Sequence, residues 1–228
     1  MHLQQLGVGP GWRCLEVGAG GGSIARWLAE RVAPSGSVQA VDLDTRLLEP
    51  LQVAGLTVRR LDVCQDELPS DCDLVHARLL LEHLPEREAA FGRMVRALRP
   101  GGWLVVTDSD FGTVRLSEKD GAFYRVASAF DAATRAAGWD PQFGPALASM
   151  FENAGLVDVT SASMADYERG GPHATLLAIS YVRLRDILLA QGARSADIDH
   201  VVERMKGSDV GTFSPTVWTA RGRRFSSG

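Results

Sequence analysis

Glycines and an acidic residue gather where a buried strand meets a helix near the start of the chain. Gly18, Gly20 and Gly22 lie two residues apart and follow Glu16 closely. Without Cβ atoms, such a backbone turns sharply and lets a ligand lie against bare peptide. The helix predicted over residues 23–32 would point its N-terminal amides and the positive end of its dipole at that ligand. The pattern therefore indicates a nucleotide-type site, with an ordinary tight strand-to-helix turn as the simpler alternative.

The first residue of the predicted helix helps to distinguish which nucleotide-type ligand the site would bind. The dinucleotide fingerprint G-x-G-x-x-G requires glycine or alanine three residues after its second glycine, and this chain has Ser23 there. An S-adenosyl ligand has no phosphate but carries a sulfonium and an ammonium group. An acidic residue just ahead of the turn suits these positive groups better than it suits a pyrophosphate.

Short apolar runs after the turn predict further strands of a parallel sheet. They are rich in β-branched residues and bounded by Gly, Pro or Asp, as buried strands are. Asp42 lies 24 residues after Gly18 at the end of one run, where a carboxylate can accept both ribose hydroxyls. Dinucleotide enzymes use the same device, so Asp42 alone discriminates little. The runs cover residues 38–44, 58–63, 73–78 and 98–106.

Taken together, these segments resemble the class I S-adenosylmethionine (SAM)-dependent methyltransferases. Glu16 with Gly18-x-Gly20-x-Gly22 resembles motif I of the family, and the Arg-Pro-Gly-Gly turn at 99–102 and the helix entry at 81–85 complete the likeness over about residues 10–110. It is similar to the ubiquinone-biosynthesis-type and natural-product enzymes. The resemblance implies an α/β, Rossmann-like fold: a seven-stranded, mostly parallel sheet with helices on both faces, an antiparallel last strand and a helical cap.

The resemblance also implies which residues hold SAM. Asp62 would meet the adenine amino group, and the backbone N–H of Val63 would bond the ring. The backbone around His76 would accept the methionine ammonium. Arg78 would pair either with the methionine carboxylate or with a surface acid. The full set of expected cofactor contacts is Glu16, Gly18, Ala19, Gly20, Gly22, Ser23, Asp42, Leu43, Asp62, Val63, His76 and Arg78.

Methyl transfer is an in-line displacement on an already activated carbon, so alignment can supply much of the catalysis. A general base is needed only when the acceptor keeps its proton until attack. The candidates are His83 and Asp110. The simpler alternatives are a helix-entry histidine bonded to backbone, and turn chemistry for Asp108 and Asp110 after the fifth strand, which is the interpretation we favour.

Strand and helix alternate as far as about residue 108, and the rhythm then changes. We expect one methyltransferase domain over 1–228, with insertions at 111–143 and 166–211 that form a cap for substrate recognition. Only about eleven residues precede the first strand, where the family usually has one or two helices that close over the cofactor. Either the chain is trimmed there, or the lid comes from elsewhere, such as a partner subunit in a homodimer. Helices are predicted over 23–32, 45–54, 85–98, 117–137 (with Ser117 as N-cap), 145–154, 173–191 and 195–206, and later strands over 156–164 and 212–221.

Composition narrows the class of partner. The 228 residues carry a net charge of −4, and no basic stripe with interleaved aromatics indicates nucleic acid. Three cysteines without metal-ligand spacing, and no leader or apolar run of spanning length, predict a cytoplasmic protein without metal or membrane contact. We expect a small organic acceptor of apolar character, modest in size and aromatic or isoprenoid-like.

Two other functions compete with methyl transfer. An NAD(P)-dependent oxidoreductase is disfavoured by Ser23 and by the lack of a Tyr-x-x-x-Lys pair. A non-catalytic SAM-binding module would keep the glycine turn, Asp42 and Asp62 without turnover. Calorimetry with SAM and NAD distinguishes a methyltransferase from an NAD(P)-dependent oxidoreductase.

Overall fold

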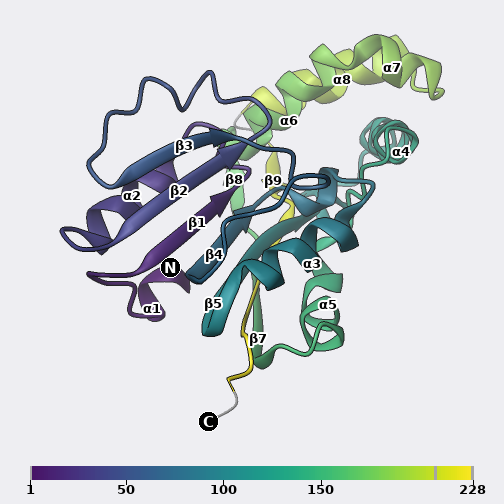
Figure 1. Ribbon diagram of the computed structural model, residues 1–228. Helices are drawn as coiled ribbons and strands as arrows, with labels where there is room; N and C mark the ends of the chain where they lie inside the picture. The colour runs from purple at the N-terminus through teal and green to yellow at the C-terminus, as the bar shows by residue number, and fades with distance from the viewer. Residues whose placement is uncertain (1, 208–209, 227–228) are drawn as a thin grey trace. The chain divides into compact units, whose positions relative to one another are not determined.

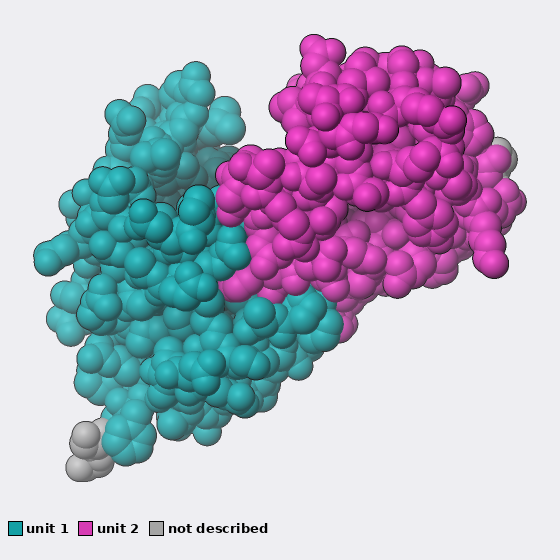
Figure 2. Space-filling view, turned by 90° about the vertical axis from the view of Figure 1, so that its right-hand side faces the viewer, with its two compact units in different colours: residues 1–108, 144–162, 218–228 teal, residues 109–143, 163–217 magenta. Residues whose placement is uncertain are grey.

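The computed structural model describes residues 2–207 and 210–226, and the chain divides into two compact units. Unit 1 comprises residues 1–108, 144–162 and 218–228, and unit 2 comprises residues 109–143 and 163–217. Figure 2 shows the two units in teal and magenta. The predicted insertions, 111–143 and 166–211, fall within the ranges of unit 2. Their role as a cap stays a prediction.

A seven-stranded sheet forms the framework, in the order β3-β2-β1-β4-β5-β10-β7. The pairs from β3 through β5 are all parallel. Figure 1 shows helices on both faces of this sheet, with α2 behind it and α3 in front. The predicted Rossmann-like fold is confirmed. The strands are β1 Arg13–Val17, β2 Ser37–Asp42, β3 Leu56–Arg60, β4 Cys72–Arg78, β5 Leu98–Asp110, β7 Val157–Met164 and β10 Thr216–Arg223.

The last strand, β10, runs antiparallel to β5. The N–H of Gly101 donates to the Arg224 carbonyl, and the N–H of Arg224 donates to the Gly102 carbonyl. Farther along β5, the hydroxyls of Thr107 and Thr219 lie 2.9 Å apart. As numbers rise on β5 they fall on β10, which is the antiparallel relation that the sequence predicted.

Helix α2 (Ser23–Val32) has the predicted bounds and packs one face on the sheet. Its buried residues, Ala25, Leu28, Ala29 and Val32, follow the i, i+3, i+4, i+7 spacing of an apolar stripe. They join residues of β1, β2 and β4 in one hydrophobic core. Because α2 is packed on the sheet, its N-terminus is held at the glycine turn in a defined direction.

The helix predicted over residues 45–54 is wrong. The N–H groups of Leu48 and Glu49 both bond the Thr45 carbonyl, but the turn does not continue. Pro50 explains this, because it lacks the N–H that a helix needs and disfavours helical geometry in the residue before it. The segment nevertheless places Leu48 and Leu51 against Gly22.

Other helices of unit 1 begin later than predicted. α3 spans Arg87–Ala97 rather than 85–98, and a short 3-10 helix, η1 (Leu81–His83), precedes it. α5 spans Leu147–Asn153 rather than 145–154, because its first turn is the 3-10 helix η3 (Gly144–Ala146). α1 (His2–Gln5) is one short turn.

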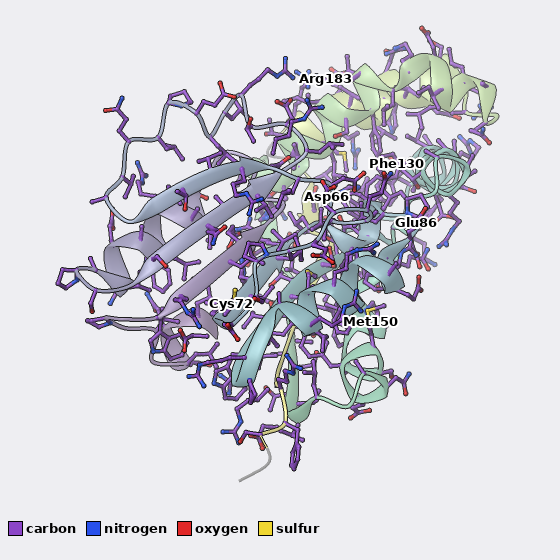
Figure 3. All side chains as sticks on the ribbon, in the orientation of Figure 1. Asp66, Cys72, Glu86, Phe130, Met150 and Arg183 are labelled. Atoms are coloured by element: carbon purple, nitrogen blue, oxygen red, sulfur yellow. The ribbon has the colours of Figure 1, made fainter. Side chains whose placement is uncertain are left out.

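Unit 2 combines four helices with a small three-stranded sheet, among the residues that the structure describes. Phe130, labelled in Figure 3, lies in its core, with ring centroids 5.6 Å from Trp139 and 5.7 Å from Tyr181. The helices are α4 Gly121–Ala136, α6 Pro172–Arg183, α7 Arg185–Ala190 and α8 Ser195–Lys206. The strands are β6 Arg115–Leu116, β8 Tyr167–Arg169 and β9 Gly211–Phe213, and η2 is Phe111–Thr113.

Helix α4 begins at Gly121 and not at the predicted residue 117, because Ser117 is bound to the small sheet. Asp120, and not Ser117, is the N-cap, and its carboxylate accepts from the N–H groups of Ala122 and Phe123. Ser117 is engaged elsewhere, because its N–H donates to the Gly211 carbonyl and its hydroxyl accepts from the Gly211 N–H. The tertiary contact with Gly211 therefore overrides the local capping preference.

Two later elements predicted as continuous are divided. The helix predicted over 173–191 is broken at Leu184, a single residue with non-helical geometry between α6 and α7. The strand predicted over 212–221 becomes β9 and β10, which join different sheets. Pro215 has no N–H for a ladder, and the Ser214 N–H bonds the Asp166 carbonyl instead.

The packing of the 45–54 segment on the glycine turn predicts an unequal effect of two neighbouring substitutions. Gly22 has φ +73°, and a Cβ there would overlap Leu51 and lie 2.8 Å from Leu48. We expect Gly22→Ala to lower the free energy of unfolding by about 1–3 kcal/mol, measured by urea denaturation. Gly21→Ala is the control, since no atom lies within 4 Å of its added Cβ. Equal losses for both variants would contradict the assignment.

Candidate functional site

The glycine turn between β1 and α2 is tied to the end of β2. The N–H groups of Gly18 and Ala19 donate to the Val41 carbonyl at 2.9 and 3.2 Å. The turn then closes through the Gly22 N–H, which bonds the Ala19 carbonyl at 2.8 Å. Gly20 has φ +52°, a conformation that favours glycine. The turn is therefore a defined shape held by its own backbone.

The three glycines differ in what lies beside them. At Gly18 a Cβ would come within 2.9 Å of the Leu80 side chain, and at Gly22 it would meet Leu48 and Leu51. At Gly20 no atom lies within 4 Å of the position a Cβ would take. Packing within the chain explains the first and third glycines but not the second. The open backbone at Gly20, next to the exposed Ser23 that begins α2, fits a ligand lying against bare peptide.

Asp42, the last residue of β2, is bound to this turn. Its Oδ2 accepts from the Gly20 N–H at 2.8 Å, and its Oδ1 accepts from the Asp44 N–H at 3.0 Å. A carboxylate has about four acceptor sites, so each oxygen can still accept a ligand hydroxyl. Leu43, which follows, is 60% exposed. Asp42 thus joins the strand end and the glycine turn that the sequence assigned to one cofactor.

Asp62 follows β3 and organises its own loop. Its Oδ1 accepts from the Cys64 N–H at 2.9 Å. Asp66, labelled in Figure 3, accepts from the Asp62 N–H at 2.8 Å. Val63, between Asp62 and Cys64, is buried. These contacts are turn chemistry, and the predicted adenine contacts of Asp62 and Val63 stay predictions.

Glu16 and His76 form a buried pair that the sequence analysis did not predict. They are register partners on β1 and β4, and His76 Nδ1 lies 2.7 Å from Glu16 Oε2. The side chains are only 3% and 5% exposed. A buried carboxylate is costly unless it is paired, so His76 lets Glu16 remain in the sheet. The signal available in the sequence was that each residue ends a predicted neighbouring strand.

The remaining predicted site residues are dispersed. Arg78 ends β4, is exposed and makes no ion pair with a described residue. His83 ends η1, with Nε2 3.3 Å from Glu82 Oε1, and burial lowers its pKa, which keeps the imidazole neutral near pH 7. Asp110 belongs to unit 2, where it caps η2 by accepting from the Gly112 N–H. That contact is the turn role favoured from the sequence.

Asp108 is the residue that sequence reasoning misjudged. It lies within β5 and not in a turn, and it is fully buried. Its Oδ1 accepts from the Leu80 N–H at 2.9 Å, whereas Oδ2 is buried without a hydrogen-bond partner among the described residues. Burial, and secondly the nearby charge of Glu82, raise the pKa of Asp108 to about 8. The sequence, an apolar strand followed by Ser and Asp, does not reveal that Asp108 is buried. Burial at a strand end depends on which neighbouring part of the chain packs against it.

A family comparison decides what this arrangement is. The model of a methyltransferase domain family matches residues 15–106, the segment that carries the turn and the strand-end acids. Residues 15–106 therefore form a methyltransferase domain of the class I, SAM-dependent type. The cofactor of this methyltransferase family is S-adenosyl-L-methionine. The assignment decides against the NAD(P)-dependent alternative.

Curated relatives of the chain include other methyltransferases. The chain is 29% identical over 154 residues to methyltransferase str2 of Strobilurus tenacellus (66% of this chain, 55% of the relative). It is 34% identical over 114 residues to the ubiquinone/menaquinone biosynthesis C-methyltransferase UbiE of Bordetella parapertussis (46% and 44%). The chain spans about half the length of the curated relatives it matches.

Among solved structures, the chain shares its fold with phosphoethanolamine N-methyltransferase 2 of Haemonchus contortus, determined with S-adenosylhomocysteine (TM-score 0.63, 20% identity, 98% of this chain and 52% of that one). It also shares it with a putative methyltransferase of Bacillus halodurans (TM-score 0.61, 17% identity, 99% and 98%). Within residues 2–207 and 210–226, no helix has the length and apolar character to cross a membrane. Nor does any cluster of three or more His, Cys, Asp or Glu there suit a metal ion.

The raised pKa of Asp108 predicts a pH dependence of stability. The folded protein keeps this proton up to about pH 8, whereas the unfolded chain releases it near 3.8. Unfolding therefore releases a proton between those values, and this group makes stability fall as pH rises through that window. We expect Asp108→Asn, which cannot ionise, to remove that slope, so that its advantage over the parent grows from about pH 5 to about pH 8 in urea titrations.

Asp44→Asn is the matched control. Asp44 is exposed, and its hydrogen bonds with Arg46 lower its pKa to about 2. It is ionised in both folded and unfolded states from about pH 5 to about pH 8, so over that range its variant should differ from the parent by a constant amount. The same constant difference for Asp108→Asn would contradict the buried, protonated carboxyl.

Proposed function

We propose that this protein transfers a methyl group from SAM to a small organic acceptor. One observation carries the proposal: the glycine turn is open at Gly20, and the carboxylate of Asp42 is fixed directly beside it. Membership of the methyltransferase family supports the same reaction. The relatives named above include C- and N-methyltransferases, so the family sets the reaction class and not the atom that is methylated.

In this proposal each end of the cofactor has its own residues. The bare backbone of Ala19 and Gly20 lies against the nucleoside, and Asp42 accepts the ribose hydroxyls. Leu43, exposed beside Asp42, offers apolar surface to the adenine. The set proposed to contact or approach SAM is Glu16, Gly18, Ala19, Gly20, Gly22, Ser23, Asp42, Leu43, Asp62, Val63, His76 and Arg78.

The methionine end would meet residues from the ends of β1 and β4. The Glu16–His76 pair keeps a carboxylate at the base of the turn, which favours a positively charged ligand group in its vicinity. The exposed guanidinium of Arg78, without a protein partner among the described residues, is free to bind the methionine carboxylate. These opposite charges suit a zwitterionic amino-acid moiety.

When bound, SAM supplies an activated methyl group on a sulfonium. The chain's own contribution is to orient the reactants and exclude water. His83 is neutral near pH 7 and so could accept a proton from an acceptor that keeps one. Asp110 is retained as a weaker candidate, since it already accepts from Gly112.

The finer parts of the proposal are inferred from the amino-acid sequence alone. Recognition of the acceptor by the ranges 111–143 and 166–211, a homodimer, and a cytoplasmic location stay predictions. Within unit 2, most aromatic side chains form its core, as expected for aromatics at helical spacing, while Tyr124 and Tyr167 are half-exposed. An apolar acceptor is therefore proposed from the composition of these ranges alone.

The first prediction of this proposal separates ligand binding from backbone strain. We expect the parent to bind S-adenosylhomocysteine in calorimetry, not to bind NAD, and to release S-adenosylhomocysteine from SAM with a member of an acceptor panel. Gly20→Val should abolish binding, because its side chain would fill the open space at the turn.

Gly155→Val is the matched control for strain. Gly155 also has positive φ (+73°) and open space around a Cβ, but it follows α5, distant in sequence from the turn. Both variants should lose stability, and only Gly20→Val should lose the ligand. Binding by folded Gly20→Val would overturn the cofactor site. Binding by the parent without turnover on any acceptor would favour the non-catalytic module.

The second prediction concerns the ribose. Asp42→Ala should weaken S-adenosylhomocysteine binding by about 1–3 kcal/mol through loss of charge-assisted hydrogen bonds. Asp44→Ala, which removes an exposed carboxylate paired with Arg46, should leave affinity unchanged. If Asp44→Ala weakens binding in the same calorimeter and Asp42→Ala does not, the ribose contact belongs to Asp44.

A further inference from the structure

The buried carboxyl of Asp108 holds the loop that follows β4. Its Oδ1 accepts from the Leu80 N–H at 2.9 Å. The backbone N–H groups of Leu80, Leu81 and Glu82 all act on this carboxyl, each favouring its charged form. These are the first amides of η1, whose own N-cap residue, Leu80, provides no side-chain cap. Asp108 of β5 therefore caps this helical turn through Leu80, which lies 28 positions earlier in the chain.

The loop has a conformation that needs such support. Leu79 has φ +52°, which is costly for a residue with a branched side chain. Its N–H donates to the Thr107 carbonyl at 2.7 Å. Two successive amides, those of Leu79 and Leu80, are thus bound by two successive residues of β5. Strained backbone persists only when the surrounding structure over-determines it, and here β5 does so.

The held loop in turn supports the glycine turn. The Leu80 side chain occupies the space at Gly18, with its Cδ1 atom 2.9 Å and its Cγ atom 3.3 Å from where a Cβ would lie. Gly18 begins the turn whose middle residue, Gly20, is open to ligand. The physical sequence of contacts is therefore the Asp108 carboxyl, the Leu80 amide, the Leu80 side chain and the Gly18 backbone, all within unit 1.

We propose that Asp108 is a positioning residue for the cofactor: by fixing Leu80 against Gly18 it sets the shape of the glycine turn and hence the affinity for SAM. The inference rests on the proposed function, since it assumes that this turn binds the cofactor. Asp108 itself touches no ligand, because its side chain is fully buried. The neutral amide of asparagine can replace this carboxyl, because one oxygen is enough to accept from the Leu80 N–H. The nearby charge of Glu82 also disfavours a negative charge at this position.

The test is calorimetry with S-adenosylhomocysteine at a temperature where every variant is folded by circular dichroism. Asp108→Ala removes the acceptor and should weaken binding at least about tenfold. Asp108→Asn keeps the oxygen and should bind within about twofold of the parent. Where Asp108→Ala does not fold, Asp108→Ser, whose hydroxyl is too short to reach Leu80, carries the same expectation.

Thr107→Val is the matched control on the same strand. It removes the buried hydroxyl contact with Thr219 and leaves the backbone carbonyl that Leu79 uses. It should lower the melting temperature with affinity unchanged. If Asp108→Ala also lowers only the melting temperature, its role is structural and the proposal is wrong.

A double-mutant cycle tests the route through Leu80. Leu80→Ala alone should weaken binding, and Asp108→Ala should add less than about twofold in that background, because both act through one contact. Full additivity would overturn the route. Failure of the parent itself to bind S-adenosylhomocysteine would instead contradict the proposed function, so the two failures are distinguishable.

Discussion

The reversal of the chain between β1 and α2 is the constraint on which the rest of the site depends. Within five residues the backbone leaves a buried central strand and starts a helix that covers the same sheet. Gly18, Gly20 and Gly22 all have positive φ there, which only glycine adopts readily. The turn is then tied to β2 through Val41 and Asp42 and bounded by Leu80 and Leu51. No atom of the protein lies within 4 Å of a Cβ at its middle residue, Gly20, which leaves the backbone there open.

Two buried acids, Glu16 before the turn and Asp108 behind Leu80, are accommodated in different ways. Glu16 is paired with a histidine on the adjacent strand. Asp108 has amide donors, a buried location and a pKa raised to about 8. Charged carboxyls in a sheet interior are expensive, so the chain either pairs them or keeps them protonated. Both groups also hold neighbouring parts of the chain, since Glu16 bonds the adjacent strand and Asp108 bonds the Leu80 N–H.

The two units differ in the parts of the sequence that they contain. Unit 1 contains the whole segment that matches the methyltransferase family, residues 15–106. Unit 2 has its own aromatic core and its own small sheet, neither of which belongs to that segment. A conserved reaction on a fixed scaffold, with additions that vary, is the usual way in which one fold serves many substrates.

The sequence by itself determined what depends on local chemistry. Glycine spacing predicted the turn and the helix that follows it, and Glu16 together with Ser23 favoured SAM over a dinucleotide. Only the tertiary structure decided contacts between distant segments. The Glu16–His76 pair arises from register between strands 60 residues apart, and Asp108 is buried because the loop from Leu79 to Glu82 closes over it. Asp120 replaces Ser117 as a cap because Gly211 competes for Ser117. Local patterns report a residue's own preference, whereas burial and pairing depend on which neighbours the completed fold supplies.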